Sequence, residues 1–484
     1  MDNNETSVKK KFDFSSYGAV IGFLCLEILA FISFYLGHSF ILYGILSLAL
    51  AVLAFLVTFR QINKDGITTF AFFVFPIFVF GLLTALSSFT YKSIGAIGVA
   101  ETVFVPIALT FISLAGFLTG YIKGFKIKTA MMIIYGALAL FVFINLIITM
   151  VYYVPFYTLI YKNSYIFYDG KPSSLPIGSM AYMLYGFQIK EVTLEYWTLF
   201  PSLLLTAVIP LFFIKYKDNR REFVIYAVIS FIAFISLLFT ISKYTLITDF
   251  ILIVGIAMIV AAEKFRKTRS IFDGMMIALG IIFLLICIVF FLAAQTSWGF
   301  LNGFRNLLNG NSLLKRLFIS NRYSSSIIVV FQDLFSSFKL FGVPVGGAAY
   351  LYPNGVSQKL SNIWIFDNLL SSGLFGAIFF LAALIIGIRR LFKYLKAEQD
   401  DPYIRCMITA YILGFLVISL FLYDATPLVN SDKMSPFFTS APLLICLFLL
   451  SYVFNKTLNT IKPASQEEKV VEIKEEQDDE TLAL

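Results

Sequence analysis

Apolar stretches alternate with short polar segments along almost the whole chain. A transmembrane helix needs about 20 apolar residues, and these stretches are continuous rather than alternating, which excludes an outer-membrane barrel. The pattern predicts an all-α polytopic membrane protein with about 12 transmembrane helices. They are expected near Tyr17–Leu36, Ser39–Phe59, Thr68–Ser88, Ile97–Gly116, Thr129–Val151, Tyr196–Ile214, Phe223–Ile241, Leu246–Ala262, Ile271–Ala294, Leu369–Ile388, Ile404–Tyr423 and Phe438–Phe454.

Composition agrees with this pattern. Hydrophobic residues make up 59% of the chain, charged residues 14%, and the mean hydropathy is +0.86, which together exclude a soluble globular protein. The first apolar stretch is too long for the core of a signal peptide and lacks a cleavage site, so it is expected to remain as a span.

The positions of Lys and Arg predict the orientation. With a cytoplasmic amino terminus, 25 of the 37 Lys and Arg residues fall on the cytoplasmic side and 12 outside, as the positive-inside rule requires. Both termini are therefore expected in the cytoplasm, and the number of spans is even. The net charge of +8 reflects this bias and is no argument for nucleic-acid binding.

This topology divides the chain into a cytoplasmic amino terminus (1–16), a transmembrane domain (17–454) and an acidic cytoplasmic tail (455–484) that is expected to be disordered. Two outer loops are long, 152–195 and 295–365. Within the second, apolar residues recur at helical spacing from Ile327 to Phe338 and predict an amphipathic helix on the outer surface. All four cysteines fall in or at the end of spans, so no outer disulfide is expected.

The second outer loop, between spans 9 and 10, carries the candidate chemistry. It contains six of the twelve outer cations and a glycine-rich run with Gly342, Gly346 and Gly347. Outward-facing Lys and Arg suit an anionic ligand, and Arg matches phosphate geometry. Lys243, at the outer end of the seventh predicted span, and Arg322 are the candidate ligands of a diphosphate. In the alternative reading such cations reach toward lipid phosphates.

The order of these features resembles the bacterial O-antigen ligase and polysaccharide polymerase (Wzy-type) superfamily of membrane glycosyltransferases. The resemblance covers about Phe239 to Ile388. It rests on four matches in chain order: Ser242-Lys243 to a Ser-Arg pair at an outer helix end, Asn321-Arg322 to an outer-loop Arg before a helix, Lys339–Gly346 to a "PLFGVGxG" turn, and Ser361–Asp367 with Gly373–Gly376 to "HNxxLExxxxxGLLG".

Two departures bear on the mechanism that this resemblance implies. Asn362 stands where the ligases carry a His, and the chain's single His, His38, lies elsewhere. The general base of the ligases therefore cannot be transferred, which favours the polymerase branch or an unusual transferase over a ligase. Asp367 is the nearest carboxylate that could accept a proton from a sugar hydroxyl. Its alternative role is a cap at the start of the tenth span.

The resemblance implies an enzyme of the bacterial plasma membrane that polymerises or ligates polyprenyl-diphosphate-linked oligosaccharides outside the cytoplasm. Asp367 and Asn362 would be catalytic, Lys243 and Arg322 would bind the diphosphate, and neither a metal nor another cofactor is expected. Expected partners are the lipid-linked glycans, membrane lipids and a chain-length regulator or flippase of the same pathway. Two alternatives stay open: a flippase or transporter of lipid-linked oligosaccharide, and a non-catalytic assembly partner.

Overall fold

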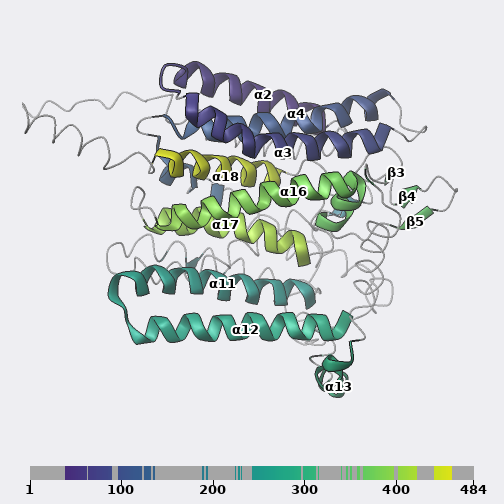
Figure 1. The fold of residues 1–484 in the computed structure, drawn as a ribbon, viewed down its shortest axis with the longest axis vertical. Coiled ribbons are helices and arrows are strands. Elements are labelled where there is room, and N and C mark those ends of the chain that lie inside the picture. Colours follow the sequence, from purple (N-terminus) through teal and green to yellow (C-terminus); the bar gives the residue numbers. More distant parts are fainter. Residues whose placement is uncertain are drawn as a thin grey trace, which may run out of the picture.

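The structure, a computed structural model, is almost entirely helical in the part of the chain that it describes (Figure 1). That part comprises residues 39–62, 64–89, 96–122, 125–131, 134–136, 188–189, 192–193, 224, 227–228, 231, 243–295, 298–311, 314, 340, 345–346, 349–351, 357–359, 364–396, 402–421 and 441–459. Its long helices are α2 (Ser39–Thr58), α3 (Lys64–Phe89), α4 (Ala96–Thr119), α11 (Lys243–Thr268), α12 (Ile271–Gln295), α16 (Trp364–Lys396), α17 (Pro402–Phe421) and α18 (Ala441–Asn459).

Within the described residues, three helices are long and apolar enough to cross a membrane, through Gly66–Leu83 of α3, Ile271–Ala294 of α12 and Ser372–Lys396 of α16. Shorter apolar stretches run through α2, α4, α17 and α18. These helices indicate a membrane protein. Of the predicted spans, Tyr17–Leu36 and Tyr196–Ile214 lie outside the described residues. Thr129–Val151 and Phe223–Ile241 lie mostly outside them.

Three hydroxyl side chains inside the bundle are satisfied within their own helices. Thr58, Ser113 and Thr119 are buried, and each donates to the carbonyl oxygen four residues earlier at 2.7 Å. A polar group in an apolar interior needs such a partner. These side chains therefore sit in the core without requiring a polar channel.

The bundle is built by side-by-side packing of helices far apart in sequence. α4 packs against α2, α3 and α18, α16 packs against α3, α17 and α18, and α11 packs against α12 and α17. Aromatic rings fill the centre: Phe70 stacks on Phe117 with ring centroids 3.9 Å apart, and Phe454 contacts both Phe70 and Phe73. The core is thus a continuous apolar layer that joins the two ends of the chain.

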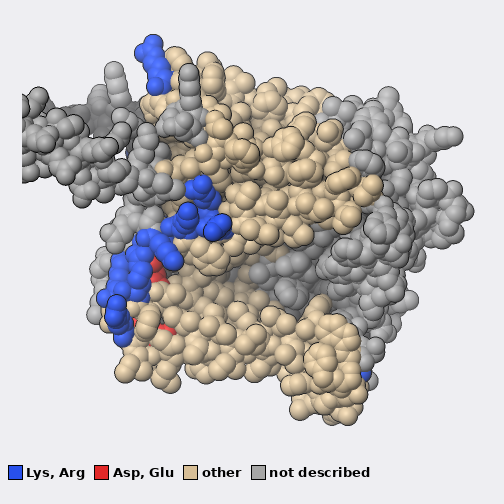
Figure 2. Space-filling view, viewed as in Figure 1, with Lys and Arg blue, Asp and Glu red and all other residues tan. Residues whose placement is uncertain are grey.

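The two ends of the bundle differ in character. One end holds the turn between α11 and α12 and the end of α16, and most of the described Lys and Arg side chains gather there (Figure 2). The other end holds the starts of α11 and α16 and the short strands β3–β5 (Figure 1). This separation is the one that the sequence predicts for the cytoplasmic and outer ends.

Short strands depart from the all-α expectation. In the first predicted outer loop, β1 (Gln188–Ile189) pairs antiparallel with β2 (Val192–Thr193). In the second, β3 (Val345–Gly346), β4 (Ala349–Leu351) and β5 (Ser357–Lys359) form an antiparallel sheet in the order β3-β4-β5. Strands of two or three residues leave no alternation to read in a sequence, because a strand pattern needs about four residues or more. The predicted amphipathic helix at Ile327–Phe338 lies outside the described residues.

Candidate functional site

Helix α16 is broken at Gly373. The backbone there has φ 72° and ψ −170°, and the helical geometry resumes on either side. This region is essentially restricted to glycine, since a Cβ atom would clash with the backbone. The break divides α16 into a short first part, from Trp364, and a long second part that runs to Lys396.

A hydrogen bond links the break to the glycine-rich segment. The backbone N–H of Phe375 donates to the carbonyl oxygen of Leu340 at 3.2 Å. An unwound turn leaves backbone groups without their partners in the helix, and here Leu340 supplies one. The bond therefore places the backbone of Leu340, which stands two residues before Gly342 in the sequence, beside the break.

The sheet β3-β4-β5 follows Leu340 in the chain and leads toward the start of α16. Gly346 pairs with Ala349 and leaves two residues, Gly347 and Ala348, between the strands, a spacing typical of a tight hairpin. β3 lies against α3, which itself packs against α16. β5 ends at Lys359, and the residues 360–363, which include Asn362, connect it to the start of α16. Along the chain, the glycine-rich run, the sheet and Asp367 therefore follow one another in this order.

The predicted site residues are only partly described. Lys243 is the first residue of α11 and so begins the eighth predicted span rather than ending the seventh. Asp367 is the fourth residue of α16, six residues before Gly373. The helix begins at Trp364, so Asp367 is not its N-cap, although it lies in the first turn, where a carboxylate favours the helix dipole.

The starts of α11 and α16 lie at the same end of the bundle (Figure 1). This places the backbones of Lys243 and Asp367 at that end. Their side chains are not described, and Arg322, Asn362, Gly342 and Gly347 lie outside the described residues. A convergence of Lys243, Arg322 and Asp367 on one cavity therefore stays a prediction.

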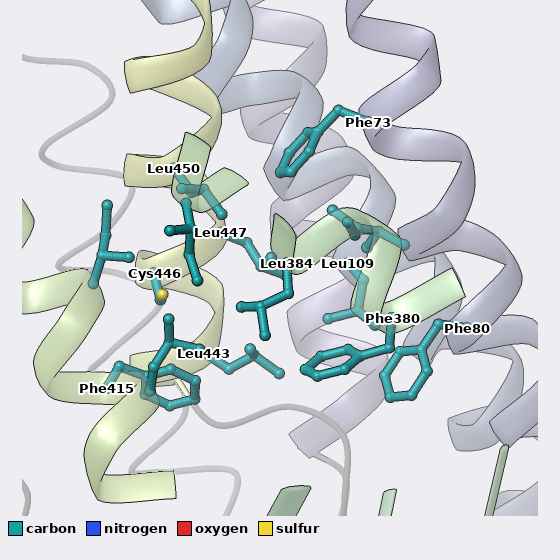
Figure 3. A pocket seen from close by; sticks show the side chains of 15 residues that line it. Phe73, Phe80, Leu109, Phe380, Leu384, Phe415, Leu443, Cys446, Leu447 and Leu450 are labelled. Carbon is teal, nitrogen blue, oxygen red and sulfur yellow. The ribbon is translucent and has the colours of Figure 1, made fainter. Parts of the chain in front are cut away.

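An apolar cavity of about 70 Å³ lies deeper in the bundle (Figure 3). It is lined from α3, α4, α16, α17 and α18, with Phe80, Leu109, Phe380, Phe415 and Cys446 among the side chains. Its α16 residues begin at Phe380, seven residues after Gly373, or about 10 Å along a helix that rises 1.5 Å per residue. A cavity without polar lining stays dry and accepts apolar groups.

One cation of the second predicted outer loop has a structural role. α13 (Asn302–Gly310) follows α12 through a 3₁₀ turn at Gly299–Leu301, and Arg305 on α13 joins the two helices. Its Nε donates to the carbonyl oxygen of Ala293 at 3.2 Å, and its guanidinium also donates to Asn302 Oδ1 at 2.9 Å. Arg305 thus donates to a carbonyl near the end of α12 and links α13 to α12.

Comparison with known proteins adds no relative: no family model matches the chain, and no curated protein or solved structure matches it.

Sequence reasoning identified the glycines of this region but missed their geometry. Gly373 and Gly376 stand inside a continuous apolar stretch, which predicts an unbroken helix. The sequence signal for the break was the pair of glycines itself. Two glycines three residues apart lower the stability of a helix interior, so they are expected there only where the backbone needs them. Nothing in the sequence points to the bond between Phe375 and Leu340, since it joins segments 35 residues apart.

Proposed function

We propose that this protein is a bacterial membrane glycosyltransferase with about 12 spans and both termini in the cytoplasm. It polymerises polyprenyl-diphosphate-linked oligosaccharides outside the cytoplasm, or ligates them to an acceptor. The observation that carries the proposal is the break at Gly373, bonded through Phe375 to Leu340. The break turns the backbone between the short first part of α16, which carries Asp367, and its long second part, and a glycine there lets a substrate approach the backbone closely.

In the proposed reaction, a sugar hydroxyl of the acceptor attacks the anomeric carbon of the donor glycan. The bond from that carbon to the phosphate oxygen breaks, and the polyprenyl diphosphate leaves with the bonding electron pair. Asp367 accepts the hydroxyl proton, and Asn362 orients the acceptor. Lys243 and Arg322 hold the diphosphate and stabilise its growing charge.

The apolar cavity supports a lipid-linked substrate. It lies about 10 Å along α16 from the break, at the depth that the first part of a lipid chain would reach if the diphosphate bound at the break. A volume of 70 Å³ has room for only a few methylene or methyl groups, so most of the chain would lie in the bilayer.

The main alternative is a flippase of the same lipid-linked oligosaccharide. Such a protein needs a polar path for the glycan, and ionisable residues commonly line it. In the described helices, the buried polar side chains are Ser, Thr and Asn, with Arg405 as the only charged one, and the cavity lining is apolar. This interior favours the transferase.

The test uses the purified chain in nanodiscs with a polyprenyl-diphosphate-linked oligosaccharide as both donor and acceptor. We expect longer lipid-linked glycans from the wild type. Removing a general base should slow elongation by about 10²–10⁴-fold, so we expect that loss in Asp367→Asn. The matched control is Asp333→Asn, which removes the acid of the second predicted outer loop and should leave elongation unchanged.

Two outcomes would contradict the proposal. One is full elongation by Asp367→Asn. The other is a wild type that moves the lipid-linked glycan across a liposome bilayer without lengthening it, which would support the flippase.

A further inference from the structure

Six cations form a basic patch at one end of the bundle (Figure 2). Lys264, Lys267 and Arg269 lie at the end of α11 and in the turn to α12, and Arg389, Lys393 and Lys396 lie at the end of α16. All but Lys264, which is half-buried, are exposed. We call these six residues the basic patch.

Direct bonds hold the two halves of the patch together. Arg266 on α11 donates to the carbonyl oxygen of Lys396 at 2.8 Å. Arg405 on α17 donates to the carbonyl oxygen of Leu395 at 2.9 Å and pairs with Glu263 on α11 at 3.1 Å. The ends of α11 and α16 are therefore fixed side by side, and the patch is one surface.

Few acidic groups in the described residues reduce this charge. Glu263 is engaged by Arg405, and also lies 3.9 Å from Arg266. Asp273, at the start of α12, accepts from the Thr268 hydroxyl at 3.5 Å. The patch keeps a strong positive charge, which suits an anionic partner.

Helix α18 brings the carboxyl-terminal segment to this end. The Arg390 guanidinium lies 4.5 Å from the centre of the Phe454 ring, so the last turns of α18 lie beside the end of α16. α18 ends at Asn459. After seven intervening residues begins the run Glu467–Glu480, with eight acidic and two basic residues and a net charge of −6.

We propose that the acidic run Glu467–Glu480 docks on the basic patch of its own chain. The residues 460–466 span up to about 23 Å when extended, which lets the run reach the patch from the end of α18. A short tether holds it there at an effective concentration of about millimolar, and the charges of patch and run are nearly equal and opposite. This proposal does not depend on the proposed function.

The test joins carboxylates to lysines in the full-length purified chain with a zero-length carbodiimide and maps the products by mass spectrometry. We expect amide links from the acidic run to Lys264, Lys267, Lys393 or Lys396. Their yield should fall in high salt, because salt screens exposed charges. Mixing isotope-labelled and unlabelled protein should show that the links form within one chain.

A variant that removes two lysines of the basic patch, and a matched control, test whether the patch itself holds the acidic run. Lys393→Gln with Lys396→Gln should reduce the yield of links to Lys264 and Lys267 by about fivefold or more, as expected when two ion pairs of ordinary strength are lost. Arg60→Gln with Lys126→Gln removes two exposed cations outside the patch and should leave that yield unchanged.

Three outcomes would overturn the proposal. One is that the acidic run links only to lysines next to it in sequence, such as Lys456 or Lys462. Another is that the links join different chains. The third is that links formed in nanodiscs of phosphatidylcholine disappear when phosphatidylglycerol is added, which would assign the patch to anionic lipid headgroups.

Discussion

Gly373 shows how a single residue shapes the candidate site. A side chain at φ 72° and ψ −170° would strain the backbone by about 1–3 kcal/mol. The neighbouring Gly376 is also restricted, since a Cβ atom there would collide with the side chain of the buried Ser372. Both glycines of the motif are therefore explained by geometry at the break.

We predict that Gly373→Ala lowers the free energy of unfolding by about 1–3 kcal/mol and abolishes glycan elongation, because the backbone can no longer present the Phe375 N–H to Leu340. Thermal unfolding in detergent and the elongation assay would measure the two effects. The control is Gly303→Ala on α13, where an added methyl group meets no atom within 4 Å. A Gly373→Ala protein with wild-type stability and activity would show that the break has no role.

The pair of Glu263 and Arg405 is the second residue-scale feature. The Arg405 side chain is 3% exposed and that of Glu263 is 11% exposed. Removing one partner of a buried pair leaves an uncompensated charge and costs about 3–5 kcal/mol.

We predict that Glu263→Ala causes a loss of this size in chemical unfolding. Adding Arg405→Met to it should restore much of the loss, because the orphaned charge is removed. Arg266→Gln, at a more exposed member of the cluster, should cost no more than about 1 kcal/mol. A double variant that is less stable than Glu263→Ala alone would contradict this account.

At the scale of elements, the apolar pattern predicted the helices well. Each of the eight long helices described overlaps a predicted span, because an apolar stretch of this length has no other way to satisfy its backbone in lipid. The ends of the helices were less predictable. α11 and α16 continue past the predicted spans, to Thr268 and Lys396, since charged residues that end a hydrophobic stretch are good helix formers.

The contact between α4 and α18 depends on glycine. A Cβ atom at Gly116 would lie 2.8 Å from the Cα of Phe448 and would collide with its carbonyl oxygen, and one at Gly120 would collide with the Asn455 side chain. Asn455 also donates to the carbonyl oxygen of Phe117 at 2.9 Å. Small residues spaced in this way let membrane helices approach closely.

We predict that Gly116→Ala pushes α4 and α18 apart and lowers stability by about 1–3 kcal/mol, the usual cost of overpacking. Gly255→Ala on α11 provides the control, because the added methyl group meets no atom within 4 Å and alanine favours a helix. Thermal unfolding in detergent would compare the two. Equal melting temperatures for both variants would refute the close contact.

On the scale of the whole molecule, the sequence predicted the separation of charge and the membrane class but not the pairing of distant segments. The positive-inside pattern follows from counting residues, and most of the described cations gather at one end. By contrast, Glu263 and Arg405 are 142 residues apart, and the cavity is lined from five helices. Such features depend on how helices pack, which a single sequence does not specify.

The candidate site shows the same division. The resemblance identified its glycines and charges, and the structure describes the break, the bond to Leu340 and the sheet. The joint action of Lys243, Arg322 and Asp367 is the central claim of the proposed function. The structure describes the backbone of Lys243 and of Asp367, and Arg322 lies outside the described residues.

The most direct test of that claim is glycan chain length in a deletion strain complemented with wild type, Lys243→Ala, Arg322→Ala or the control Lys315→Ala, at equal protein levels. We predict full-length polymer with wild type and Lys315→Ala. Both Lys243→Ala and Arg322→Ala should instead accumulate single-repeat lipid-linked units at the outer leaflet, because the leaving diphosphate loses its stabilising charge. Full-length polymer in both of these variants, or units trapped at the cytoplasmic leaflet, would contradict the account.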